Sequence, residues 1–85
     1  MQLSEVLENI ELKKRGIVVI GFWKAGDHEF AVLARRGEKV FPVPKLFHLI
    51  EVSPEDRNPK VSSAEMRSIL ERFKFFEAIS NLHTE

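Results

Sequence analysis

The chain contains no cysteine, so neither disulfides nor a thiolate zinc site can supplement its core. No stretch is long and apolar enough to span a membrane. The segment Met1–Glu5 lacks the basic-then-apolar order of a signal peptide. We therefore expect a soluble protein of the reducing cytoplasm, without a membrane partner. A length of 85 residues predicts a single domain, residues 1–85, with one modest core.

Charge is balanced over the whole chain but not along it. Thirteen Lys and Arg residues balance thirteen Asp and Glu residues, which argues against the broad basic field of a strong nucleic-acid binder. The segment from Lys13 to Lys45, however, contains eight basic residues and only three acidic ones. This distribution permits one basic face toward an anion, or a solvated surface of mixed charge.

The first element predicted is an amphipathic helix of about residues 4–14. Apolar residues recur at helical spacing from Leu3 to Ile10, with glutamates on the other side. Gly16 follows the basic cluster that ends this segment and can take the positive φ of a helix C-terminus.

A three-stranded antiparallel meander follows. The segment 17–23 is rich in β-branched and aromatic residues, and Gly26 and Asp27 supply turn chemistry before a second strand over residues 28–36. Residues 39–44 read as the third strand, which ends at Pro42 and Pro44. The segment 46–52 is apolar enough for a further strand or a helical turn, and residues 53–59 form a loop.

The last element predicted is a second helix. Ser62 and Glu65 match a capping box, and an apolar stripe continues from Met66 toward Ile79 or Leu82. Two helices on one face of an antiparallel sheet give an α+β two-layer sandwich in the order α-β-β-β-α. The opposite face of the sheet is left open and needs polar residues or a partner.

Three histidines are the candidates for proton transfer: His28, His48 and His83. Their spacing fits no metal motif, so we expect neither a metal nor a cofactor. His28 begins the second strand, and its imidazole can exchange a proton at neutral pH. Alternatively, His28 is a surface residue paired with Asp27 or Glu29. His48 lies in an apolar segment typical of packed residues, and His83 lies in the tail.

Aromatic residues offer two further interpretations. Those of the strands and their connections can stack on bases or pack in the core, and packing is the commoner role. They are Phe22, Trp23, Phe30, Phe41 and Phe47. In the last helix, Phe75 lies off the main stripe and is a candidate contact to a second chain.

The order of four short motifs resembles that of the HicA (YcfA-like) toxin family. Lys13–Ile17 is similar to its basic–Gly–apolar entry to the first strand, and Gly26–His28 to its Gly-x-His signature. Arg36–Pro44 resembles a strand that ends in Val-Pro, and Glu65–Leu70 resembles the Arg-Ser-Ile-Leu helix. Together they span roughly residues 3–75.

The resemblance implies a fold like that of double-stranded-RNA-binding domains and cleavage of mRNA as an endoribonuclease. It also implies neutralisation by a HicB-type antitoxin. His28 would be the catalytic acid or base, and Lys24, Arg35, Arg36 and Lys39 would bind the RNA backbone.

A second hypothesis keeps the fold without the catalysis. Asp27 and Glu29 flank His28, and a neutral chain gains little from neutralising phosphates. On this interpretation the domain is a protein-interaction or homodimerisation module that uses the open sheet face or Phe75.

Overall fold

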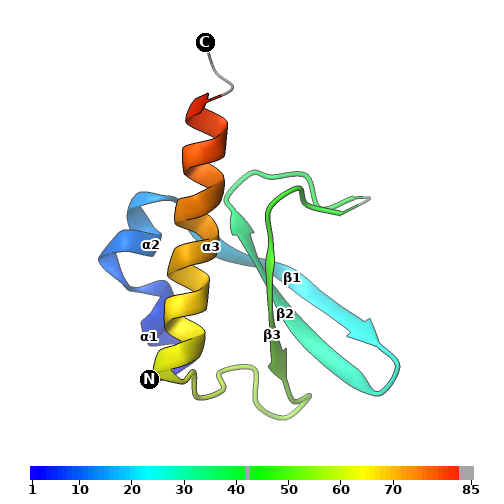
Figure 1. Cartoon of the computed structure of the whole chain (residues 1–85). Coiled ribbons are helices and arrows are strands. Elements are labelled where there is room, and N and C mark those ends of the chain that lie inside the picture. Colours follow the sequence, from blue (N-terminus) through cyan, green and yellow to red (C-terminus); the bar gives the residue numbers. More distant parts are fainter. Residues whose placement is uncertain (42, 83–85) are drawn as a thin grey trace.

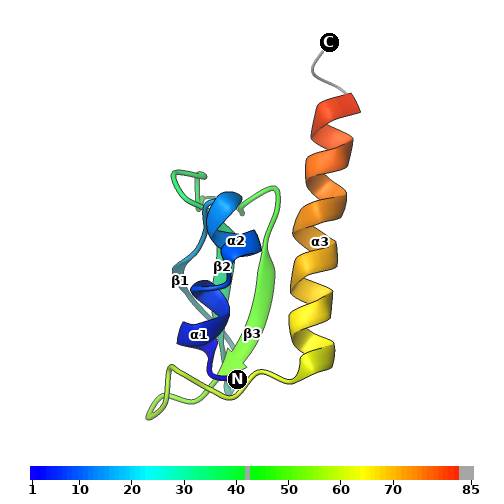
Figure 2. The same ribbon diagram turned by 90° about the vertical axis from the view of Figure 1, so that its left-hand side faces the viewer.

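A computed structural model describes residues 1–41 and 43–82, with side chains described for 1–41 and 43–74. Its elements are α1 (Leu3–Leu7), α2 (Ile10–Lys14), β1 (Ile17–Ala25), β2 (His28–Arg35), β3 (His48–Val52) and α3 (Ser63–Leu82). The helices lie on one side of a three-stranded antiparallel sheet of order β1-β2-β3 (Figures 1 and 2). The α+β class and the three-stranded antiparallel sheet are therefore confirmed. No helix within these residues is long and apolar enough to cross a membrane.

The first predicted helix is two short helices. Asn9 separates α1 from α2, and its Oδ1 accepts a hydrogen bond 2.9 Å long from the N–H of Glu11. An Asn side chain competes for backbone donors in this way, so it starts a new helix instead of continuing the old one. Gly16 follows α2 with φ of 70°, as predicted for a residue after a helix end.

The meander is confirmed for its first hairpin and corrected for its third strand. Gly26 and Asp27 form a two-residue turn between β1 and β2, with Gly26 at φ of 62°. The predicted strand over residues 39–44 is wrong, because residues 39–41, 43 and 44 belong to the irregular connection between β2 and β3. The third strand is β3, which pairs with β2 over Glu29 to Leu33. A proline within a segment cannot donate to a ladder, which favours a non-strand connection there.

The core lies between the helices and one face of the sheet. Its largest fully buried side chains are Val6, Leu12, Leu33, Ile69 and Phe73. The N-terminus is tied to the segment before α3, since the N–H of Leu3 donates to the carbonyl of Pro59 at 2.9 Å. The last turns of α3 extend beyond the sheet (Figure 1).

Candidate functional site: the open sheet face

The strand register decides which side chains share the face opposite the helices. Directly opposed residues of antiparallel strands point to the same side of the sheet. Leu33 is in the core, so its neighbour Val32 points to the open face, together with its partner Gly21 on β1. Trp23 pairs with Phe30 on this same face. The predicted open face therefore carries aromatic side chains near its hairpin end.

The connection between β2 and β3 runs beside this face and encloses an apolar groove with a volume of about 340 Å³. The described lining of the groove contains no charged residue. It is formed by Gly21, Phe22, Trp23 and Val32 of the sheet and by Val40, Phe41, Val43, Pro44 and Phe47 of the connection. Trp23 is 50% exposed and Phe41 is 88% exposed. Large apolar side chains left open to water mark a contact surface.

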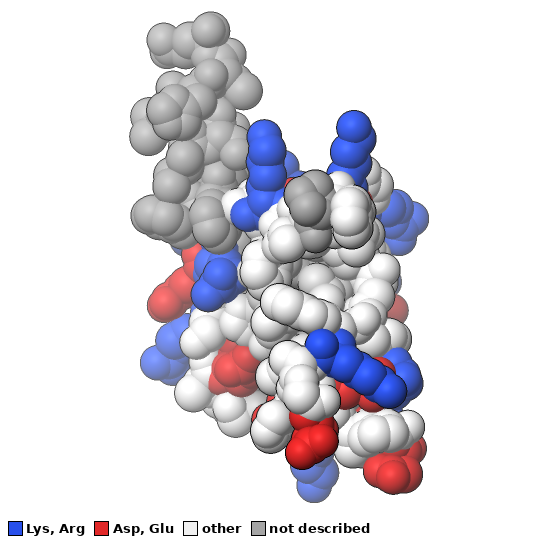
Figure 3. Space-filling view, turned by 90° about the vertical axis from the view of Figure 1, so that its right-hand side faces the viewer, with Lys and Arg blue, Asp and Glu red and all other residues white. Residues whose placement is uncertain are grey.

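The charges around the groove are unevenly placed. Figure 3, which views the molecule from the sheet side, shows an uncharged area with Lys and Arg side chains above it and a mixture of acidic and basic side chains below it. In the chain, Lys39 comes directly before the lining residue Val40, and Lys45 directly after Pro44. The connection thus combines an apolar lining with flanking cations.

His28 is exposed on the open face and has a carboxylate partner. Its Nδ1 lies 2.6 Å from Oε1 of Glu51, and its ring stacks on Phe30 with centroids 6.3 Å apart. The register explains this contact, because Glu51 of β3 is opposite Phe30, two residues from His28 on β2. A carboxylate at Nδ1 fixes the tautomer and leaves Nε2 to exchange a proton. Sequence reasoning missed Glu51, because the pattern of residues 46–52 fits either a strand or a helical turn and does not indicate pairing with β2.

The predicted RNA-binding residues do not gather around His28. Lys24 is near His28 in the hairpin, but in the strand register it is opposite Glu29 and therefore lies on the other face of the sheet. Arg35 lies at the far end of β2, about 23 Å from His28 at the rise of an extended strand. Arg36 lines a hollow between α2 and the start of β1, and Lys39 belongs to the connection above the groove.

The two acidic residues beside His28 in the sequence differ in their burial. Asp27 is exposed in the turn, whereas Glu29 is buried on the helix side of the hairpin. The Oε1 atom of Glu29 lies 2.8 Å from Nη2 of Arg57, whose guanidinium stacks 4.0 Å from the centroid of the Phe22 ring. This contact fastens the loop before α3 to the strand that lines the groove.

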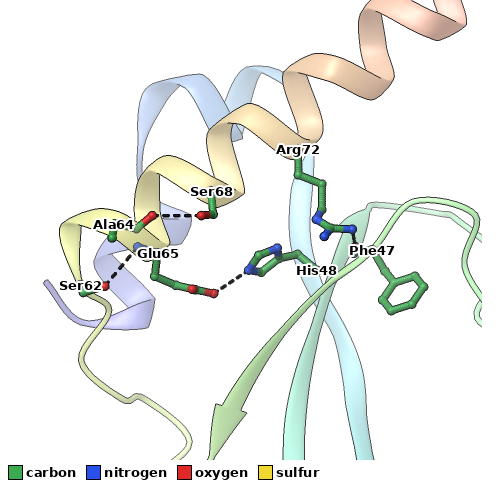
Figure 4. A network of polar contacts seen from close by, with 7 residues as sticks. All are labelled: Phe47, His48, Ser62, Ala64, Glu65, Ser68 and Arg72. Carbon is green, nitrogen blue, oxygen red and sulfur yellow. Dashed lines mark hydrogen bonds and ion pairs between the residues drawn. The ribbon is translucent and has the colours of Figure 1, made fainter.

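His48 has a structural role, as its apolar surroundings predict. It is buried, and its Nε2–H donates to Oε1 of Glu65 over 2.6 Å (Figure 4). Arg72 donates to the carbonyl of Phe47 at 3.3 Å, so two contacts join the start of β3 to α3. Ser62 accepts from the N–H of Glu65, as the capping motif predicts. The carboxylate of Glu65 is directed to the sheet, where it contacts His48.

The remaining candidates lie elsewhere. His83 and the side chain of Phe75 are outside the described residues. In the part of the chain that the structure describes, no three His, Asp or Glu residues are close enough to hold a metal ion. A scan against protein-family models and searches of curated proteins and of solved structures each give no significant match.

Proposed function

We propose that this domain is a non-catalytic interaction module that binds a partner protein in the groove on its open sheet face. The uncharged groove, with the exposed Trp23 and Phe41 at its surface, carries the proposal. Aromatic residues are enriched where protein interfaces have their strongest contacts. A pocket walled by Val32, Val43 and Pro44 fits an inserted apolar side chain.

The charges support a protein partner over RNA as the ligand of this groove. The chain is neutral, and the nearest partner of His28 is the carboxylate of Glu51. Each additional phosphate contact requires a cation, and Arg35 and Arg36 lie at the far end of β2.

Panning a random peptide library on the immobilised domain tests this proposal. We expect enriched peptides with apolar anchors that bind the wild type and lose at least about tenfold in affinity with Trp23→Ser or Phe41→Ser, since a buried aromatic anchor contributes more than about 1 kcal/mol. Ile10→Ser is the matched control, because Ile10 is 67% exposed on α2, away from the groove. Peptides that bind all variants equally would rule out the groove.

A ribonuclease of the HicA kind is the second candidate function. The specific observation in its favour is the exposed His28 with Nδ1 held 2.6 Å from Glu51. In this proposal Nε2 removes the proton of a 2′-hydroxyl that attacks phosphorus, and Glu51 stabilises the imidazolium. Lys24 would bind RNA near the reaction, with Arg35, Arg36 and Lys39 at more distant phosphates. The element order around three antiparallel strands supports a fold like that of double-stranded-RNA-binding domains.

In that case the protein would be a cytoplasmic toxin, and a HicB-type antitoxin would occupy the groove. Cleavage of single-stranded RNA by the purified protein tests the activity. We expect His28→Ala to abolish cleavage, Glu51→Gln to slow it and Ile10→Ser to leave it unchanged. Equal cleavage by wild type and His28→Ala would remove His28 from the mechanism.

A further inference from the structure

The outer edge of β1 is an unused strand edge beside the groove. In the sheet order β1-β2-β3, β1 has one neighbour, β2. Among the described residues, no hydrogen bond outside this pairing involves the backbone of Ile17–Ala25. Edge strands with unpaired backbone groups are templates for another strand.

The turn fixes which backbone groups face outward. Ala25 and His28 flank the two-residue turn, so they exchange hydrogen bonds as a pair. Bonded and non-bonded pairs alternate along an antiparallel ladder, which places the N–H and C=O groups of Phe22 and Lys24 on the free edge. Phe22 also lines the groove, so an added strand would lie alongside it.

Several cations lie near this edge, with the exposed Asp27 in the turn at its end. Lys24 is exposed on β1 itself, and Lys39 and Lys45 flank the lining residues of the connection. The half-exposed Arg57 lies over Phe22. An incoming segment therefore gains from acidic residues, and its apolar side chains can enter the groove at alternate positions.

We propose that the partner presents an extended segment, with apolar and acidic residues in alternation, which adds to the free edge of β1 as a fourth strand. The inference rests on the proposed function and specifies how the groove is filled. A second copy of the chain is a poorer occupant, because β1 contains no acidic residue and would bring Lys24 of each copy toward the same basic surroundings. Backbone pairing supplies affinity, and the groove supplies the choice of side chains.

A synthetic peptide of alternating Phe and Glu, titrated into the full chain, tests the inference. The fluorescence of Trp23, the chain's one tryptophan, reports binding, and the anisotropy of a fluorophore on the peptide reports it for variants that lack Trp23. We expect the same peptide with Lys in place of Glu to bind at least about tenfold more weakly, since like charges brought together at an interface cost several kcal/mol.

Two measurements isolate the strand pairing. Lys24→Pro removes the outward N–H, while Lys24→Gln removes the same charge and keeps the N–H. One hydrogen bond contributes about 0.5–1.5 kcal/mol, so we expect the proline variant to bind up to about tenfold more weakly than the glutamine variant. Amide hydrogen exchange in the wild type provides the second measurement, and the amides of Phe22 and Lys24 should exchange more slowly with peptide bound.

Peptide binding that weakens with Trp23→Ser but leaves both amides unprotected would overturn the strand pairing and retain the groove. Equal binding of the Lys and Glu peptides would refute the acidic partner. Protection of the two amides that rises with protein concentration, without peptide, would instead identify a second copy as the occupant. Binding unaffected by both Trp23→Ser and Phe41→Ser would contradict the proposed function itself.

Discussion

Arg57→Ala tests whether the buried carboxylate of Glu29 depends on a single guanidinium. The Glu29 side chain is 7% exposed, and its Oε1 lies 2.8 Å from Nη2 of Arg57. Its Oε2 is buried without a partner among the described residues. The substitution therefore leaves a buried negative charge without its counterion, and it also removes the stacking of Arg57 on Phe22.

The expected loss follows from the burial of the two partners. Removing one partner of a buried ion pair costs about 3–5 kcal/mol. Arg57 is 47% exposed, so solvent screening reduces this to about half, near 2 kcal/mol. The lost cation–π contact adds about 0.5–1 kcal/mol. We expect the free energy of unfolding to fall by about 2–3 kcal/mol.

Urea unfolding monitored by Trp23 fluorescence measures this loss. Arg67→Ala is the control, because Arg67 is exposed on α3. Adding Glu29→Gln to Arg57→Ala should recover about 1 kcal/mol, because a neutral amide is less costly to bury than a carboxylate. A loss with Arg57→Ala no larger than that of the control, or no recovery with Glu29→Gln, would contradict the dependence of Glu29 on Arg57.

Three further outcomes are expected. Phe73→Ala should lower the free energy of unfolding by about 3–5 kcal/mol in urea, because Phe73 is fully buried where α3 meets the core. Gly26→Ala should lower it by about 1–2 kcal/mol in the same assay, because Gly26 has φ of 62°. The Arg15 guanidinium lowers the pKa of Glu11 through a hydrogen bond and its charge, so Arg15→Ala should raise that pKa in an NMR titration. Because the folded-state pKa is lowered, this pair stabilises the protein at higher pH, and its contribution is lost as pH falls through that pKa.

Local sequence patterns predicted the elements that are defined by near neighbours. The hairpin follows from the β-branched run and the Gly26-Asp27 turn, and α3 follows from its cap at Ser62. The first helix was predicted too long, because apolar periodicity does not register the capping preference of Asn9. The third strand was misplaced because residues 39–44 and 48–52 are both short and apolar. Tertiary pairing with β2 distinguishes them.

The candidate site was less predictable than the fold because it depends on register. The sequence predicted that His28 is a candidate and that one sheet face is open. The contact of His28 with Glu51 depends on the pairing of β2 with β3, and these two strands are separated in the sequence by the long connection. The groove required the path of that connection across the sheet, which follows no periodic signal. The basic residues of the central segment are near in sequence but lie at both ends of β2.

Titration of the wild type, Phe41→Ser and Ile10→Ser with the Phe–Glu peptide decides whether the groove is the binding site. With Trp23 fluorescence as the signal, we expect saturable binding to the wild type and Ile10→Ser with similar Kd. We expect binding to Phe41→Ser to be weaker by at least about tenfold. The same Kd for all three proteins would contradict binding in the groove.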